Sequence, residues 1–230
     1  MKFDKEKPFE FLFKAKAEGK RVVVITGAGV STDSGLPDFR SKEGLWRGKN
    51  PADVASVEAM EDNYEEFLEF YTERYQLLQM CNPNRNHEII GKLTELGFIS
   101  TVITQNIDMF HRPYHKDSNL IELHGALEFV SDNGKIRPNV VLYGEDIKEH
   151  VLIRAYTELL DADIVVAIGT SLTVNPMRAL VQEVMLRGVE LVILNNEATA
   201  LDSDAHLIYH SDINNILEPV AEQVNVAELG

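Results

Sequence analysis

Polar side chains stand directly after several of the apolar runs in this sequence. Gln105, Asn106 and Asp108 follow one run, His124 follows the next, and Thr170 follows a later one. If these runs are strands of one parallel sheet, their carboxyl ends meet at the edge where such sheets bind ligands. Amide, hydroxyl, carboxylate and imidazole groups gathered there can bind a polar ligand and transfer protons, and packing alone does not explain them.

A glycine turn follows the first apolar run, in the stretch VVVITGAGVS at positions 22–31. Gly27 and Gly29 give the first half of a dinucleotide fingerprint, but Thr32 stands where its third glycine is expected. Glycines let the backbone approach a pyrophosphate, and the amino end of a following helix would point N–H groups at the anion. The stretch therefore predicts a phosphate-binding turn, although G-x-G alone is a weak signal.

Short β-branched runs alternate with helical patterns along most of the chain. One helical pattern covers 83–96, and another follows Asn175 and Pro176, its predicted N-cap and first residue, and stops at Gly188. This alternation predicts the α/β class: a Rossmann-like parallel sheet with helices on both faces and right-handed crossovers. The predicted strands are Val22–Thr26, Ser100–Thr104, Leu120–Leu123, Val140–Tyr143, Ile164–Ile168, Glu190–Leu194 and His206–Tyr209.

Two segments interrupt the alternation. Residues 41–79 are largely helical in pattern and should project from the strand ends, and 126–138 contains Asp132-Asn133-Gly134, a hairpin turn signal. We therefore expect one catalytic domain over 1–230, with a Rossmann-like core at about 15–40, 80–125 and 139–230. A small inserted, mainly helical subdomain would comprise about 41–79 and 126–138.

Composition excludes several kinds of protein. The formal net charge of −15 argues against a nucleic-acid-binding surface, and no apolar run reaches the ~18 residues that a membrane span needs. The single cysteine, Cys81, leaves no intrachain disulfide and no C-x-x-C metal pair. Residues 1–20 mix charges among phenylalanines, which predicts an amphipathic helix and no secretion signal, so we expect a cytoplasmic protein.

Six motifs occur in a fixed order: GAGVS, SGLPDFR, TQNID, LHG, RPNVVLYGE and GTSLTV. Together they closely resemble the sirtuins, the NAD-dependent protein-lysine deacylases, over nearly the whole chain from about 22 to 213. The resemblance implies NAD as cosubstrate, an acyl-lysine protein or peptide as substrate, and nicotinamide, deacylated lysine and O-acyl-ADP-ribose as products. It also accounts for the incomplete fingerprint, because this family has its own glycine turn followed by a cofactor-binding loop.

The resemblance assigns roles at the cofactor. Ala28, Gly29 and Thr32 would line the phosphate turn, Phe39 and Arg40 would cover the nicotinamide ribose and the phosphates, and residues of TQNID would hold the ribose hydroxyls and the carboxamide. Thr170 and Ser171 would meet the phosphates, Asn195 the adenosine ribose, and Asp212 and Ile213 the adenine edge. Asn106, Asp108 and His124 would be catalytic. The cofactor-binding set implied is Gly27, Ala28, Gly29, Thr32, Asp38, Phe39, Arg40, Gln105, Asn106, Ile107, Asp108, His124, Gly169, Thr170, Ser171, Asn195, Asp212 and Ile213.

In this reaction the acyl oxygen attacks the anomeric carbon as nicotinamide leaves, and a ribose hydroxyl must then lose a proton. His124, next to Gly125 at a strand end, suits that base role because a histidine titrates near ~6.5. His87, at the start of a helix, is predicted to cap or pack. The other histidines, predicted to be surface or turn residues, are His111, His115, His150, His206 and His210.

The substrate side carries two further implications. The RPNVVLYGE motif would offer the peptide an edge strand through the backbone of Val141, Leu142, Tyr143 and Gly144. Tyr71 and Arg74 share a helix face and resemble the Y-x-x-R pair with which desuccinylase-type sirtuins grip acidic acyl groups. The alternative is a core tyrosine and a surface arginine paired with a nearby acid.

The chain departs from the family in one respect. Most sirtuins carry a zinc module with two cysteine pairs between the HG and RP motifs, whereas residues 126–138 hold no cysteine and are too few. We therefore expect no metal and a zinc-module loop reduced to a hairpin. Two other functions stay open: transfer of ADP-ribose to protein or water, as an ADP-ribosyltransferase or NAD glycohydrolase, and, with less support, non-catalytic sensing of NAD.

Overall fold

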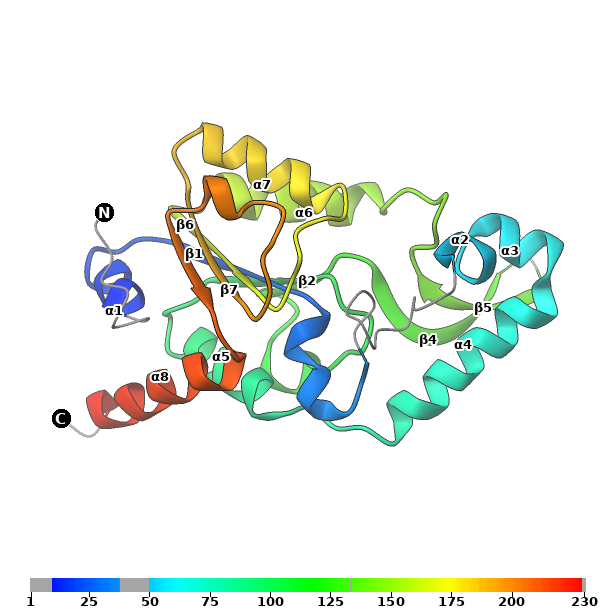
Figure 1. The fold of residues 1–230 in the computed structure, drawn as a ribbon, viewed down its shortest axis with the longest axis horizontal. Helices are drawn as coiled ribbons and strands as arrows, with labels where there is room; N and C mark the ends of the chain where they lie inside the picture. The colour runs from blue at the N-terminus through cyan, green and yellow to red at the C-terminus, as the bar shows by residue number, and fades with distance from the viewer. Residues whose placement is uncertain (1–9, 38–49, 133, 229–230) are drawn as a thin grey trace.

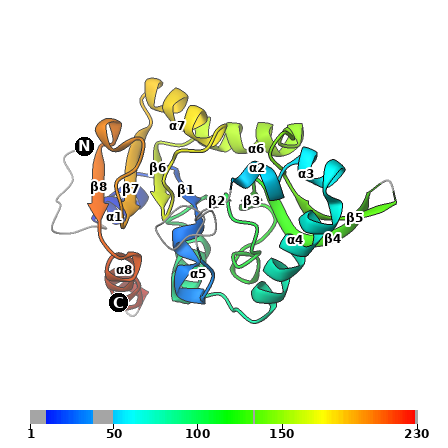
Figure 2. The ribbon, with the colours of Figure 1, turned by 45° about the vertical axis from the view of Figure 1, so that its right-hand side comes forward.

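The computed structural model of the protein describes residues 10–37, 50–132 and 134–228. Its centre is a six-stranded parallel sheet with the strand order β3-β2-β1-β6-β7-β8, which Figure 2 shows from right to left. The chain builds outward from β1 to β2 and β3, and later from β6 to β7 and β8, as in dinucleotide-binding sheets. The strands are β1 (Val22–Thr26), β2 (Thr101–Thr104), β3 (Leu120–Glu122), β6 (Ile164–Ile168), β7 (Glu190–Asn195) and β8 (Leu207–His210).

Helices cover both faces of this sheet (Figure 1). Every residue of β1 and β6 is buried, which explains their unbroken apolar sequences. One face packs on α1, α5 and α8 through residues such as Phe11, Ile90 and Leu217, and the other packs on α6 and α7. The helices are α1 (Glu10–Ala17), α5 (Arg85–Glu95), α6 (Glu149–Leu160), α7 (Met177–Leu186) and α8 (Ile213–Glu228).

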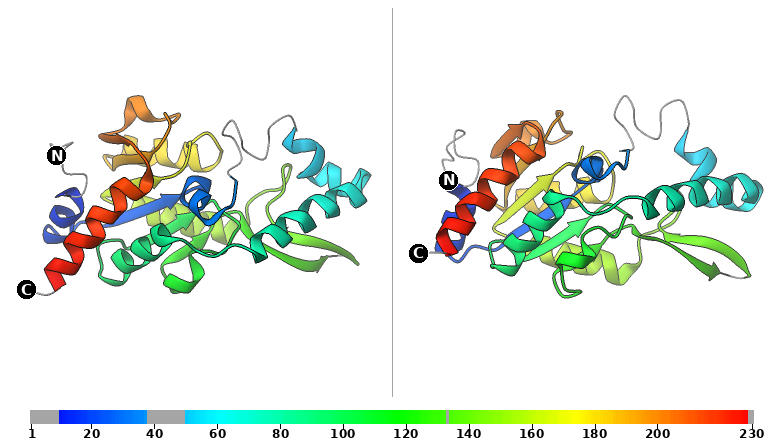
Figure 3. Two further views of the ribbon diagram at one scale, coloured as in Figure 1. Left: turned by 60° about the horizontal axis from the view of Figure 1, so that its bottom comes forward. Right: turned by 90° about the horizontal axis from the view of Figure 1, so that it is seen from below.

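The remaining elements form a second group at one end of the sheet. Helix α4 and the hairpin β4–β5 extend away from the sheet together (Figure 3). Phe67, Tyr71, Leu127 and Leu142 belong to a third apolar cluster there, separate from the two that flank the sheet. The elements are α2 (Pro51–Val54), α3 (Val57–Asp62), α4 (Tyr64–Gln79), β4 (Gly125–Asp132) and β5 (Lys135–Val140).

Most predicted strands are present, and the hairpin is confirmed by the pairing of Asp132 with Lys135. Asn133 of its turn lies outside the described residues. The predicted strand Val140–Tyr143 is wrong: β5 ends at Val140, and Leu142–Glu145 is a turn closed by the Glu145 N–H on the Leu142 carbonyl. Gly144 has φ +91° at the third position of this turn, which glycine accommodates without strain.

The helix predicted to follow the glycine turn is also absent from the described residues up to 37. Two single turns of 3-10 helix stand there instead, η1 (Ala28–Val30) and η2 (Thr32–Ser34). Two further 3-10 turns are η3 (Arg112–Tyr114) and η4 (Asp202–Asp204). Within the described ranges, no helix has the length and apolar character needed to cross a membrane.

Candidate active site

A cavity of about 850 Å³ opens at the carboxyl ends of β1 and β6, where the strand order reverses. Sheets of this type bind their ligands at this point. Asp38, Phe39 and Arg40, predicted to cover the cofactor, lie outside the described residues. The predicted site residues that line the cavity are Gly27, Ala28, Gly29, Thr32, Tyr71, Arg74, Gln105, Asn106, Ile107, His124, Val141, Leu142, Tyr143, Gly144, Gly169, Thr170, Ser171, Asn195, Asp212 and Ile213.

The floor of the cavity is formed by two glycine turns in direct contact. A Cβ on Gly27 would lie 2.7 Å from the Gly169 carbonyl oxygen, and one on Gly29 would lie 2.9 Å from the Gly169 Cα. Gly169 has φ +61°, and a Cβ there would lie 2.6 Å from the Val30 backbone nitrogen. These glycines therefore let the turn after β1 pack against the turn after β6; their approach to a pyrophosphate stays a prediction.

Amide side chains join the two turns to β2. Gln105 donates from Nε2 to the Thr170 hydroxyl at 2.8 Å. Asn106, 4% exposed, donates from Nδ2 to the Gly27 carbonyl at 3.0 Å and to the Ser31 hydroxyl at 3.1 Å. These bonds fix the orientation of the Asn106 amide and leave its Oδ1 as the accepting atom.

Asp108 does not line the large cavity but borders a smaller one of about 50 Å³, which shares Ala28, Arg74, Asn106 and Ile107 with the first. The Ser31 hydroxyl donates to Asp108 Oδ2 at 2.6 Å, and the Phe110 N–H donates to Oδ1 at 3.0 Å. Burial raises the pKa of Asp108, and these donors counteract it in part. The carboxyl group is thus buried in a small recess beside the main cavity.

Ser31 and His87 extend this set of polar groups, and the sequence interpretation missed both as site residues. His87 caps α5, as predicted, since its Nδ1 accepts the Asn84 backbone N–H at 3.2 Å. The Ser31 hydroxyl gives its only proton to Asp108, so its Oγ accepts from His87 Nε2, which lies 3.3 Å away. A serine directly after a buried glycine turn was the signal that could have identified this link.

His124 has the geometry of a base. Its Nδ1 lies 3.0 Å from the Gln105 backbone carbonyl oxygen, which can only accept, so Nδ1 carries the proton. In the neutral ring Nε2 is then the basic nitrogen. Since His124 lines the cavity and is only partly buried, it can reach a ligand there.

The prediction that His111 is a surface or turn residue is wrong. His111 is 1% exposed, and its Nε2 lies 3.0 Å from the Thr26 hydroxyl at the end of β1. Its ring stacks edge-on against His87 at 4.9 Å and against His115 at 5.4 Å between centroids. Burial lowers the pKa of all three histidines, that of His87 to about 4.

At the far end of the cavity, the residues predicted to meet adenosine make local bonds. Asn195 donates to the Glu197 carbonyl at 2.7 Å, and Asp212 accepts the Asn214 backbone N–H at 2.9 Å, which starts α8. Asn214 also donates to Asp33, which follows β1. This bond holds the start of α8 against the turn after β1 at this end of the cavity.

The segment predicted to bind a peptide already uses much of its backbone. The Tyr143 N–H and carbonyl pair with the Ala55 carbonyl and the Val57 N–H, each at 3.0 Å. Both backbone groups of Leu142 bond to Glu145. Among the described residues, no partner bonds the Val141 carbonyl or the N–H and carbonyl of Gly144, whereas the other backbone groups of Val141–Tyr143 are hydrogen-bonded.

Tyr71 and Arg74 both line the cavity, and Tyr71 also belongs to the apolar cluster of the second group of elements. Arg74 is not the outer-surface residue of the alternative interpretation: its guanidinium lies 5.3 Å from the Phe70 ring centre, inside the cavity wall. Burial lowers the pKa of Arg74 and raises that of Tyr71. A guanidinium keeps its charge even so, because its reference pKa is far above neutrality.

Within the described ranges, no three His, Cys, Asp or Glu side chains are grouped so that they could hold a metal ion. Cys81 is partly buried with a free thiol.

Comparison with known proteins agrees with this geometry. Residues 27–133 and 131–176 match the sequence model of the Sir2 family. NAD-dependent protein deacetylase 1 of Geobacillus kaustophilus is 36% identical over 231 residues, covering 90% of this chain and 95% of its own. The NAD-dependent protein deacetylase of Saccharolobus solfataricus is 36% identical over 229 residues, with 88% and 91% coverage.

Solved structures give the same result. A Sir2 homologue variant in complex with ADP-ribose superimposes with a TM-score of 0.88 and 30% identity, over 95% of this chain and 97% of that one. A Sir2 variant with a deacetylated p53 peptide and 3'-O-acetyl ADP-ribose gives 0.86 and 32%, over 94% and 98%.

Proposed function

The chain belongs to the Sir2 family and is an NAD-dependent protein deacylase, and from that premise we propose which of its residues carry the reaction. His124 is the general base, Asn106 and Asp108 act at the nicotinamide end, and the segment from Val141 to Gly144 receives the acyl-lysine peptide. The observation that supports this most is that the cavity between β1 and β6 brings the amide, hydroxyl and imidazole groups of separate strand ends together, with Asp108 in the adjoining recess.

The residues present fit NAD. The cavity lies at the switch point of the sheet, is lined by the hydroxyl side chains of Thr170 and Ser171, and shares lining residues with the recess that contains Asp108. Bound NAD supplies an anomeric carbon from which nicotinamide leaves and to which the acyl oxygen adds. A neutral amide such as nicotinamide suits a recess whose carboxyl group is buried and held by Ser31.

The protein's own side chains then orient the reacting groups and transfer protons. Asn106, fixed by Gly27 and Ser31, presents Oδ1 as an acceptor for a hydroxyl or a water. His124 takes the proton of a ribose hydroxyl at Nε2, because the Gln105 carbonyl holds the other ring proton at Nδ1. The peptide's backbone bonds to the Val141 carbonyl and to Gly144, since Leu142 and Tyr143 already use theirs within the protein.

The acyl group would be acidic. Tyr71 and Arg74 face the same cavity as Tyr143, and a guanidinium in a cavity wall attracts a carboxylate on the acyl chain. Succinyl- and glutaryl-lysine are the substrates that this arrangement favours over acetyl-lysine.

We also propose that the enzyme works without zinc. The sequence holds one cysteine, and the hairpin that stands in place of a zinc module is tied to α4 by Tyr64, whose hydroxyl bonds both backbone groups of Ile136 at 2.8 and 3.0 Å. A cytoplasmic location is a further proposal and rests on the sequence of residues 1–20 alone.

One experiment tests the proposed function. The protein is incubated with NAD and either acetyl-, succinyl- or glutaryl-lysine peptide, and nicotinamide and O-acyl-ADP-ribose are followed by mass spectrometry. Peptide-dependent nicotinamide release with an O-acyl product is expected. Release without peptide would identify an NAD glycohydrolase, and no release would contradict the catalytic assignment.

A further inference from the structure

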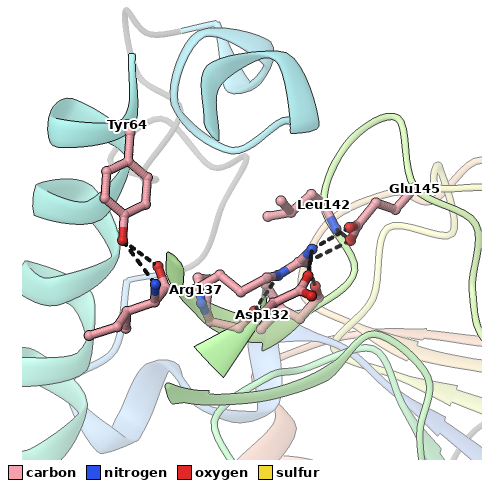
Figure 4. Close-up of polar contacts among 8 residues, drawn as sticks. Tyr64, Asp132, Arg137, Leu142 and Glu145 are labelled. Atoms are coloured by element: carbon pink, nitrogen blue, oxygen red, sulfur yellow. Dashed lines mark hydrogen bonds and ion pairs between the residues drawn. The ribbon is translucent and has the colours of Figure 1, made fainter. Parts of the chain in front are cut away.

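An ion pair joins the hairpin to the turn that follows it. Arg137 of β5 contacts Glu145 through two parallel hydrogen bonds, Nη1 to Oε1 at 2.5 Å and Nη2 to Oε2 at 2.8 Å (Figure 4). The Arg137 side chain is 12% exposed and that of Glu145 27%, so both groups are largely removed from water. Bidentate pairs of this kind fix geometry as well as charge.

Both partners also bind the backbone of the turn. Arg137 donates from Nη2 to the Val140 carbonyl at 3.0 Å, and Glu145 Oε2 accepts the Leu142 N–H at 2.9 Å. The Glu145 N–H closes the turn on the Leu142 carbonyl at 3.0 Å. The pair thus holds the backbone on both sides of Val141, whose own N–H bonds the His124 carbonyl at 2.9 Å.

Arg137 is itself held in place from the other side. Tyr64 of α4 bonds the backbone of Ile136, the preceding residue of β5, and the Asp132 carboxylate lies 3.8 Å from Arg137 Nη1 (Figure 4). Burial raises the pKa of Glu145, but the bonds from Arg137 and the Leu142 N–H outweigh it and lower the pKa below its usual value. Glu145 therefore stays ionised at neutral pH and keeps its bonds.

From these contacts we infer that Arg137 and Glu145 are positioning residues for the acyl-lysine peptide. They hold the turn in which the backbone of Leu142 is hydrogen-bonded to Glu145. The Val141 carbonyl and the Gly144 backbone then face the peptide. The inference rests on the proposed function, because it takes this turn to be the peptide-binding edge. The inference gives Arg137 and Glu145 no role in NAD binding. Their contacts lie on the hairpin and on the turn Leu142–Glu145, and not on the two glycine turns after β1 and β6.

The test compares steady-state kinetics of the whole enzyme and three variants, Glu145→Ala, Glu145→Gln and Arg137→Met. Losing a hydrogen bond to a charged group corresponds to about a tenfold or larger effect. Glu145→Ala and Arg137→Met should raise KM for the peptide about tenfold, with KM for NAD and kcat changed less than about threefold. Glu145→Gln keeps the side-chain volume and an acceptor for the Leu142 N–H, so it should give a smaller rise.

The matched control for Glu145→Ala is Glu122→Ala, which breaks another bidentate pair, between Arg112 and Glu122 at 2.9 and 2.8 Å. That pair contacts no residue of the turn, so KM for the peptide should stay within about twofold of the wild-type value. An unchanged peptide KM in Glu145→Ala would overturn the inference. So would KM values for peptide and NAD that rise together with a falling melting temperature, because that pattern indicates a structural role only.

The wild-type enzyme distinguishes failure of the proposed function from failure of the positioning role. If it shows no peptide-dependent nicotinamide release, the proposed function fails and this inference fails with it. If it turns over normally and the variants keep the wild-type peptide KM, the proposed function stands and only the positioning role is lost.

Discussion

The hydrogen bonds around Asn106 explain why so many polar residues occupy one strand edge. Asn106, Asp108 and His87 each bond the Ser31 hydroxyl, so these polar groups satisfy one another although the fold buries them. The sequence identified Asn106 and Asp108 through their motif but gave His87 only a capping role. A linear motif shows which groups follow one strand, and it does not show which groups of a distant helix meet them.

Replacement of His124 tests the base assignment. His124→Ala should lower deacylation by roughly 10²–10⁴-fold, the usual effect of losing a general base. NAD affinity should stay near the wild-type value, because the phosphate-side residues are untouched. Calorimetric titration with NAD and single-turnover deacylation would measure the two quantities, and full activity of the variant would contradict the assignment.

The acyl preference is tested at Arg74. A charge-assisted hydrogen bond contributes ~1.5–3 kcal/mol, which corresponds to roughly a ten- to hundredfold preference for succinyl over acetyl in kcat/KM. Arg74→Met removes the charge and keeps most of the stem volume, so the preference should disappear mainly through loss of succinyl activity. Competition between the two peptides measures the ratio; a wild-type enzyme that favours acetyl would show that the arginine is not a selectivity residue.

At the scale of elements, the sheet was predictable and the connections at its carboxyl edge were not. The runs that became β1 and β6 are apolar throughout because both faces are covered, and their bounds match the prediction. The run Val140–Tyr143 is equally apolar, but it ends a hairpin and enters a turn held by Ala55, Val57 and Glu145. Periodicity cannot separate these cases, since the difference depends on partners far away in sequence.

The contact between the two glycine turns leads to a prediction for Gly27. Gly27→Ala would place a Cβ 2.7 Å from backbone and side-chain atoms of the β6 turn, and such overpacking costs about 1–3 kcal/mol of folding free energy. It should also weaken NAD binding, because the two turns must move apart. Denaturant unfolding and NAD titration measure both effects.

Gly97→Ala is the matched control. Gly97 has φ +73°, and a Cβ attached to it would have no atom within 4 Å, so its substitution strains the backbone and displaces nothing. We expect some loss of stability and unchanged NAD affinity. If Gly27→Ala also left NAD affinity unchanged, the turn contact would have no part in shaping the cofactor site.

For the molecule as a whole, the buried histidines set an acid limit on stability. Burial lowers the pKa of His87 to about 4 and those of His111 and His115 below the usual value, whereas the unfolded chain titrates near ~6.5. Protons therefore bind the unfolded state more tightly. The stability present above ~6.5 should fall as the pH drops toward 4, by about 3 kcal/mol from His87 alone.

Denaturant unfolding at a series of pH values between about 7.5 and 4.5 measures this slope. His111→Gln should reduce the slope, whatever its effect on stability at neutral pH. The buried carboxyl of Asp108 acts in the opposite direction, because its raised pKa favours the folded state in acid. A slope unaffected by His111→Gln would remove that histidine from the acid response.

The proposed metal independence also concerns the whole chain. Elemental analysis of the purified protein should find no stoichiometric zinc, and a strong chelator should change neither the melting temperature nor the deacylation rate. One zinc per chain, or a chelator-induced loss of stability, would contradict the proposal.

The position of β1 at the centre of the sheet also has a consequence for biosynthesis. Its two neighbours, β2 and β6, are far downstream: β2 follows the whole α2–α5 stretch, and β6 follows the hairpin and α6 as well. As the chain leaves the ribosome, the segment Val22–Thr26 therefore remains without its pairing partners while most of the protein is still being made. An unpaired, uncharged β-branched pentapeptide is prone to aggregation, so a nascent chain stalled before Thr101 should bind a general chaperone and one extended past Ile168 should release it.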